Sequence, residues 1–138
     1  MCLVTWNIAP KIADEDTVCY KVLLYDGKSY ESPYFKGTKW EIGNKHHCGR
    51  RAQVTSYENW AVIEGGYFHS FMEKEDAINA ASFLGEGAVV FEAIIPKGSI
   101  MWNGFTADSR KDSYASKDLV IEKEIYVAPH KVAKIKTI

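Results

Sequence analysis

His69 is the residue whose setting most suggests chemistry. It follows the glycine pair Gly65–Gly66 and precedes Ser70, where a helix is predicted to begin. Free amide groups and the dipole at a helix N-terminus favour anions, and an imidazole placed there could act as an acid or base near neutral pH. The structural alternative is that His69 packs in the core and donates one hydrogen bond, as lone histidines usually do. We expect a binding corner between Gly65 and Ser70, with His69 more its anchor than a catalyst.

The glycine pair itself allows backbone angles closed to other residues, or a close approach of another group to the main chain.

Glu92 is the second candidate, because it is the sole charge in the apolar run Ala88–Ile95. Burying an unpaired carboxylate costs several kcal/mol, so Glu92 must pair, protonate or face a cleft. The plain alternative is a position facing solvent. Perturbed carboxylates gather at functional sites, so we include Glu92 in the predicted cleft.

Two further carboxylates, Glu122 and Glu124, share a face of any regular strand that contains them. Such a pair is compatible with general acid/base work or with recognition of sugar hydroxyls. Glutamates flanking a lysine are also common on exposed strands, and that interpretation is favoured for these two.

The most basic stretch is Lys45–Arg51, which we predict to be an exposed loop. Arg50 and Arg51 could hold a phosphate chain while neighbouring aromatic rings stack on bases, although a solvated loop is the better hypothesis. The stretch also contains His46-His47-Cys48, but contiguous ligands lack the spacing that closes a tetrahedral site. We therefore predict no metal site and no cofactor.

Cysteine usage points to a reducing compartment. Cys2, Cys19 and Cys48 are odd in number and irregularly spaced, which suits free thiols in the cytoplasm better than a disulfide framework. Cys2 after Met1 also raises the idea of an N-terminal nucleophile, with the free amine as its base. Hydrolases of that type resemble a larger double-sheet sandwich, and the length of this chain argues against one.

These residues must be positioned by an α+β fold, a twisted and mostly antiparallel sheet with one principal helix at about 71–84 packed on it. Ser70-Phe71-Met72-Glu73 has the spacing of a capping box, and Ala77, Ala80, Ala81 and Leu84 form one face that would lie against the sheet. Thr17–Tyr25 and Ala88–Ile95 are predicted as largely buried strands.

The remaining segments are less regular. A later strand, Leu119–Val127, should contain a bulge near Lys123, since that lysine would otherwise share a face with Ile121 and Ile125. Asn103–Gly104 has the chemistry of a hairpin turn. We expect residues 1–16 to be a lead-in segment, residues 106–117 to be a mobile loop, and Lys131–Ile138 to be a charged edge strand.

Length and charge limit the function classes. A chain of 138 residues predicts a single domain, 1–138, with a core of its own. Its 17 basic and 18 acidic side chains nearly balance, so there is no long-range attraction for nucleic acid or an anionic membrane. No apolar run approaches the ~20 residues of a membrane helix, and no leader peptide is recognisable. These features predict a cytoplasmic protein.

The order of several short motifs resembles a family of small proteins of unknown function encoded by gut bacteria and their phages. In chain order the motifs are Cys19-Tyr20-Lys21-Val22-Leu23, Ser32-Pro33-Tyr34, Trp40-Glu41-Ile42-Gly43, Gly66-Tyr67-Phe68-His69-Ser70-Phe71 with Asp76-Ala77, Ile95-Pro96-Lys97-Gly98-Ser99, and Tyr114-Ala115-Ser116 with Val120-Ile121. The likeness spans about residues 1–127. It implies an intracellular phage or prophage setting and no catalytic residue.

A partial likeness concerns ADP-ribosyltransferases. Ile95–Ser99 followed by Glu122-Lys123-Glu124 is similar to their strand, turn and glutamate-x-glutamate segment. The resemblance implies that Glu124 would orient the nicotinamide ribose of NAD. The chain departs from that pattern in the first strand, where Tyr20–Lys21 stand in place of an arginine, and in lacking a serine-threonine-serine segment.

The sequence therefore predicts a non-enzymatic domain that binds a small ligand or a protein partner. Its predicted site is formed by residues around the glycine pair, the apolar strand and the basic loop, namely Gly65, Gly66, His69, Ser70, Glu92, Arg50 and Arg51. An enzyme of the transferase type and a nucleic-acid-binding protein are the alternatives.

Overall fold

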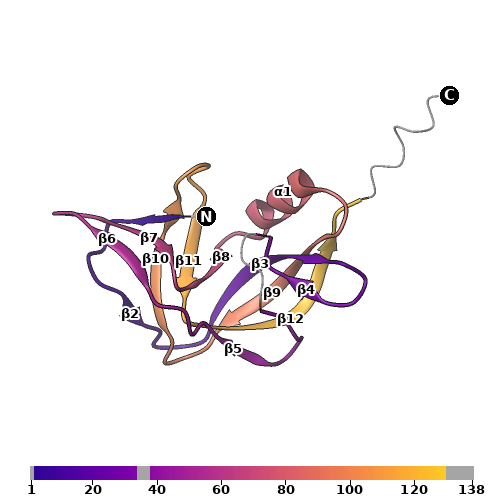
Figure 1. The fold of residues 1–138 in the computed structure, drawn as a ribbon, viewed down its shortest axis with the longest axis horizontal. Coiled ribbons are helices and arrows are strands. Elements are labelled where there is room, and N and C mark those ends of the chain that lie inside the picture. Colours follow the sequence, from indigo (N-terminus) through magenta and orange to yellow (C-terminus); the bar gives the residue numbers. More distant parts are fainter. Residues whose placement is uncertain (1, 34–37, 130–138) are drawn as a thin grey trace.

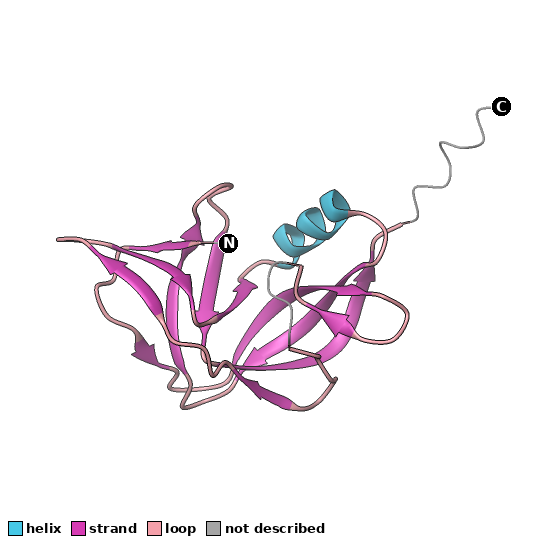
Figure 2. Ribbon diagram, in the orientation of Figure 1, coloured by secondary structure: helices cyan, strands magenta, loops and turns pink. Residues whose placement is uncertain are grey.

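A computed structural model describes residues 2–33 and 38–129. Within them the chain forms one helix and twelve strands of a single, strongly curled sheet (Figures 1 and 2). In chain order the elements are β1 (Leu3–Thr5), β2 (Lys11–Ile12), β3 (Thr17–Tyr25), β4 (Tyr30–Glu31), β5 (Lys45–His47), β6 (Gln53–Ser56), β7 (Ala61–Gly65), β8 (Phe68–Phe71), α1 (Lys74–Leu84), β9 (Ala88–Ile95), β10 (Ile100–Thr106), β11 (Asp112–Ser116) and β12 (Asp118–Val127).

The strands follow the order β5-β12-β9-β3-β8-β11-β10-β1-β7-β6, with β2 beside β10 and β4 beside β3. Every pairing between them is antiparallel. The prediction of a mostly antiparallel sheet with one helix is confirmed. With 51% strand and 9% helix, the sheet dominates so strongly that the α+β label fits loosely.

The strands β3 and β9 have the predicted bounds and pair along eight positions, from Thr17 opposite Ile95 to Leu24 opposite Ala88. They are buried on both faces because each face has its own cover. The α1 face carries Val22 and Val90, which pack with Ala77 and Ala81 of the helix. The other face carries Cys19, Leu23 and other side chains of the largest hydrophobic cluster, which also contains Trp40, Phe68, Met101 and Leu119.

The helix ends where it was predicted to end, at Leu84, and Gly85 follows with a φ of +85°. Its start was predicted wrongly. Ser70 and Phe71 belong to β8, where they pair with Tyr114 and Ser113 of β11, so Ser70 is buried in the ladder and cannot cap a helix. The N-cap is Glu73, and it forms no side-chain cap bond.

Three other segments differ from expectation. The lead-in 1–16 contains β1, which pairs with both β7 and β10, and β2. The second half of the expected loop 106–117 is largely β11 (Asp112–Ser116), a strand between β8 and β10. The expected hairpin turn at Asn103–Gly104 lies inside β10.

The predicted bulge in β12 is confirmed by register shifts between Ile121 and Lys123 and between Glu124 and Tyr126. Lys131–Ile138 lies outside the described residues.

Candidate functional site

The sheet divides between β3 and β8. These two neighbours pair at a single position, Tyr20 opposite Phe71, whereas β3 pairs with β9 along its length. Beyond Tyr20 the main-chain oxygen of His69 accepts a hydrogen bond from the side chain of Lys21, at 2.7 Å from Nζ. The Lys21 side chain therefore replaces the backbone hydrogen bonds that would otherwise continue the pairing of β3 and β8. Where these two strands diverge, they leave a pocket.

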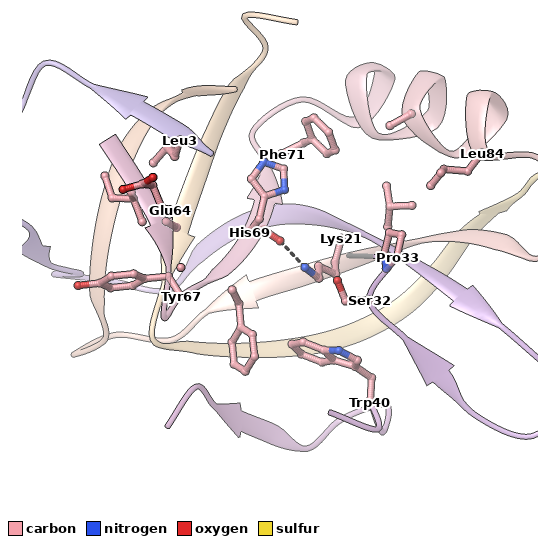
Figure 3. Close-up of a pocket in the computed structure, with 16 residues that line it drawn as sticks. Leu3, Lys21, Ser32, Pro33, Trp40, Glu64, Tyr67, His69, Phe71 and Leu84 are labelled. Carbon is pink, nitrogen blue, oxygen red and sulfur yellow. Dashed lines mark hydrogen bonds between the residues drawn. The ribbon is translucent and has the colours of Figure 1, made fainter. Parts of the chain in front are cut away.

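The pocket is a partly open hollow of about 70 Å³, shown in Figure 3. By the same measure a single water needs on the order of 10–15 Å³, so the space suits a small molecule. Its walls are mostly apolar and come from both halves of the sheet and from α1; they include Leu3, Val22, Ile63, Phe68, Phe71, Leu84 and Ala115. Mostly apolar walls with a few polar groups are typical of small-molecule sites.

Lys21 is the most unusual polar group of the pocket. It is buried, with 6% of its surface exposed, and lies on the same face of β3 as Cys19 and Leu23. Among the described residues no carboxylate forms an ion pair with it. Burial lowers the pKa of Lys21 to about 8, and the neighbouring thiols Cys19 and Cys48 act in the opposite direction.

His69 lines the same pocket and stands edge-on to Phe71, with ring centroids 4.9 Å apart. Burial is the main cause, and the positive charge of Lys21 the second cause, that together lower the pKa of His69 to about 3. The ring is therefore neutral at physiological pH. Its Nε2 atom is shielded from solvent and has no hydrogen-bond partner.

Trp40 covers the pocket opposite His69 (Figure 3). Its ring lies 5.7 Å from Lys21 Nζ and packs edge-on against Phe68, with centroids 4.7 Å apart. An isolated β-bridge to Tyr30 fixes its backbone. The indole Nε1–H is buried and has no acceptor. Two ring nitrogens of the pocket, one on Trp40 and one on His69, thus lack the partners that buried polar atoms usually have.

The glycine pair confirms the predicted close approach. Gly66 has a φ of +86°, and a Cβ atom on it would lie 2.5 Å from the Cα of Ala52 and the oxygen of Arg51. Lys117 secures the same contact by donating hydrogen bonds from Nζ to the main-chain oxygens of Gly66 and, at 2.9 Å, Arg50. Gly65 lines the pocket, whereas Gly66 holds the basic segment against the turn before β8.

Several predicted site residues do not reach the pocket. Ser70 is buried and close to Cys19, and it does not line the pocket. Glu92 is half-buried on β9, between Tyr20 of β3 and Lys123 of β12. A lysine directly across the strand is a favourable neighbour for its carboxylate. Glu92 does not line the pocket that contains His69.

The basic stretch is partly ordered by the sheet: Lys45–His47 is β5, paired with β12, and Cys48 is buried. Arg50 and Arg51 have exposed side chains outside the pocket walls. The stacked rings of Tyr57 and Trp60, 4.2 Å apart, lie at the other end of the hairpin formed by β6 and β7. The arginines and this aromatic pair therefore do not form one surface.

Glu124 is exposed on β12, outside the pocket walls. It lies near Tyr30, whose pKa is raised first by burial and then by the charge of Glu124. The structure thus places Glu124 and His69 at different locations.

The residues that sequence reasoning missed are Lys21 and Trp40. A signal for Lys21 was present, since it interrupts a strand that is otherwise apolar on that face, between Cys19 and Leu23. The same argument that selected Glu92 could have selected it. Trp40 had no such signal, because its position depends on a loop and on a bridge to Tyr30.

Comparison with known proteins finds no matching family model, no matching curated protein and no matching solved structure. Among the described residues, no helix is both long and apolar enough to cross a membrane.

Proposed function

We propose that this protein is a binding module whose pocket between β3 and β8 holds a small organic molecule. The observation that carries the proposal is that three residues lining one mostly apolar pocket, Lys21, His69 and Trp40, each carry a buried side-chain nitrogen. Two of these nitrogens lack any partner, and the third makes one hydrogen bond.

An unsatisfied buried polar group costs about 1–3 kcal/mol, and a ligand that supplies the missing partner recovers that cost. The indole N–H can only donate, and the ammonium of Lys21 can only donate. The pocket therefore favours a ligand with at least one acceptor oxygen, together with an apolar or aromatic body for the walls formed by Leu3, Phe68 and Leu84.

Two alternatives have less support. An NAD-dependent transferase would need Glu124 beside the bound ribose, and Glu124 lies outside the pocket. Its test is NAD turnover that is lost in Glu124→Gln. A nucleic-acid-binding protein would need the basic and aromatic groups together, and they are at opposite ends of a hairpin. Its test is retention on a polyanion column, lost when Arg50 and Arg51 are neutralised.

The cellular setting is part of the proposal. Cys2, Cys19 and Cys48 are free thiols, which suits a reducing compartment. A cytoplasmic role in a phage or prophage context agrees with this, and the partner would be a metabolite of the host or a protein that delivers one.

The proposal is tested by ligand-observed NMR with a set of small aromatic and aliphatic carboxylates, aldehydes and nucleotides. Trp40→Phe removes the indole N–H and keeps a ring, and His69→Ala removes the imidazole. We expect both variants to weaken binding at least tenfold. Arg51→Ala, outside the pocket, is the matched control and should bind like the wild type. Binding of every identified ligand that is unchanged in both pocket variants would refute the proposal.

A further inference from the structure

Lys21 offers a reactive group that simple binding does not use. Its amine is enclosed by the pocket, donates one hydrogen bond to the main-chain oxygen of His69 at 2.7 Å, and faces the ring of Trp40 at 5.7 Å. Among the described residues no carboxylate neutralises or blocks it. Figure 3 shows its Nζ between His69 and Trp40, within the pocket.

Apolar surroundings favour the uncharged form of such an amine, because burial penalises the ammonium. With its pKa lowered to about 8, Lys21 is unprotonated in roughly one molecule in ten at pH 7, compared with fewer than one in a thousand for an ordinary lysine. An unprotonated amine in an apolar pocket is a nucleophile toward carbonyl carbon. Lys21 Nζ is thus both enclosed by the pocket and able to offer its lone pair to a bound molecule.

From this geometry we infer that the pocket takes a small aldehyde or ketone and that Lys21 Nζ joins it reversibly as an imine; this inference rests on the proposed binding function. The nitrogen lone pair forms a bond to the carbonyl carbon, and the carbonyl electron pair moves to oxygen, which takes up a proton. The nitrogen gives up its two protons, a second proton reaches the oxygen, and the C–O bond breaks as water leaves and the nitrogen lone pair forms the C=N bond. The two protons lost by nitrogen balance the two gained by oxygen. No oxidant or reductant takes part.

The neighbouring groups match this ligand class. The Trp40 Nε1–H is a donor without an acceptor, which suits a carbonyl oxygen. The neutral imidazole of His69 offers a second unpartnered nitrogen on the other side of Nζ. The apolar walls accommodate an alkyl or phenyl substituent. The pocket therefore suits a small carbonyl compound.

The test uses the wild-type protein with propanal or benzaldehyde and sodium cyanoborohydride at pH 7, which reduces an imine to a stable secondary amine. Intact mass and peptide mapping then identify the modified lysines. We expect Lys21 to be labelled at least tenfold faster than any exposed lysine, and this preference to vanish in urea-unfolded protein. Labelling that is confined to exposed lysines would overturn the inference.

Two controls separate this inference from the binding proposal. Lys21→Arg keeps a donor for the oxygen of His69 but cannot form the reduced adduct at this position, so site-specific labelling should disappear while circular dichroism confirms the fold. Ligand-observed NMR with benzoate, which cannot form an imine, reports binding alone. Benzoate binding that depends on Trp40, without labelling of Lys21, would retain the binding module and reject imine formation. Absence of both would reject both.

Discussion

The Nζ atom of Lys21 donates a hydrogen bond to the main-chain oxygen of His69 across 2.7 Å, at the place where β3 and β8 diverge. A side chain here takes the role that a backbone amide has elsewhere in the sheet. Lys21 therefore has two functions in one position: it connects the two halves of the sheet, and it places an amine in the pocket.

The stability of the fold should rise between pH 7 and pH 9 because of Lys21. Its pKa is about 8 in the folded protein against 10.5 ordinarily, so over this range the unfolded chain binds more protons than the folded one. The burial penalty on the ammonium is thus fully present well below pH 8 and is relieved as the pH rises through 8. We expect a gain of about 1 kcal/mol by urea unfolding, absent from Lys21→Met.

The predicted rise in stability is limited to pH 7–9, because Cys19 lowers the stability of the fold at higher pH. Burial raises the pKa of this thiol from 9.0 to about 12, so its contribution to stability falls above pH 9. A stability that is independent of pH from 7 to 9 in the wild type would contradict the burial of an unpaired Lys21 amine.

Acid should destabilise the protein through His69. Its pKa is about 3 when folded and 6.5 ordinarily, so the unfolded chain takes up a proton first as the pH falls below 6.5. Between pH 6.5 and 4.5 we expect a loss of about 2 kcal/mol relative to His69→Phe, measured by urea unfolding of both proteins. Carboxylates such as Asp26 titrate in both proteins, so their effect cancels in the difference. Equal acid sensitivity of the two proteins would mean that His69 accepts a proton in the folded state.

Gly104 should tolerate no side chain. A Cβ atom there would lie 2.1 Å from the oxygen of Val4, because β1 is the antiparallel neighbour of β10 at this point. Gly104→Ala should cost about 3 kcal/mol or more in the free energy of unfolding. The matched control is Gly49→Ala, where nothing lies within 4 Å of the added atom, and its change should stay within about 0.5 kcal/mol. Similar midpoints in thermal unfolding for the two variants would show that β1 can move away from β10.

Lys117 should stabilise the turn before β8. Its Nζ donates to main-chain oxygens of Gly66, Arg50 and Cys48, and lies 4.7 Å from the centre of the Tyr67 ring. Lys117→Met leaves these carbonyls without their charged donor, which should cost about 1.5–3 kcal/mol. Lys97→Met, at an exposed turn, is the control and should change stability little. Proteolysis of the segment near Arg50 and Arg51 should also accelerate in the Lys117 variant alone.

Sequence patterns predicted the elements whose character is local. β3 and β9 are long segments rich in β-branched and aromatic residues, and their bounds match the prediction. The buried helix face, Ala77 and Ala81, follows from the period of 3.6 residues, and the bulge in β12 follows from one misplaced lysine. In each case the pattern that predicts the element involves residues only a few positions apart in the chain.

The errors concern elements that depend on distant partners. β1 and β11 are short and polar in part, and they become strands because β7, β10 and β8 supply their hydrogen bonds. Because β8 pairs with β11, Ser70 belongs to a strand and does not cap the helix as its sequence spacing suggested. The pocket could be located only in part, because His69 and the glycine pair are adjacent in sequence, whereas Lys21 and Trp40 join them through the sheet.

The path of the chain between the two halves of the sheet has a consequence for how the molecule can be divided. β1, β2, β6, β7, β8, β10 and β11 lie on one side of the seam between β3 and β8, and β3, β4, β5, β9 and β12 lie on the other. The backbone passes back and forth between these groups, so each half is assembled from non-contiguous segments. No single cut can release either half as an autonomous fragment, and split-protein or truncation designs should keep the whole of residues 3–127 together.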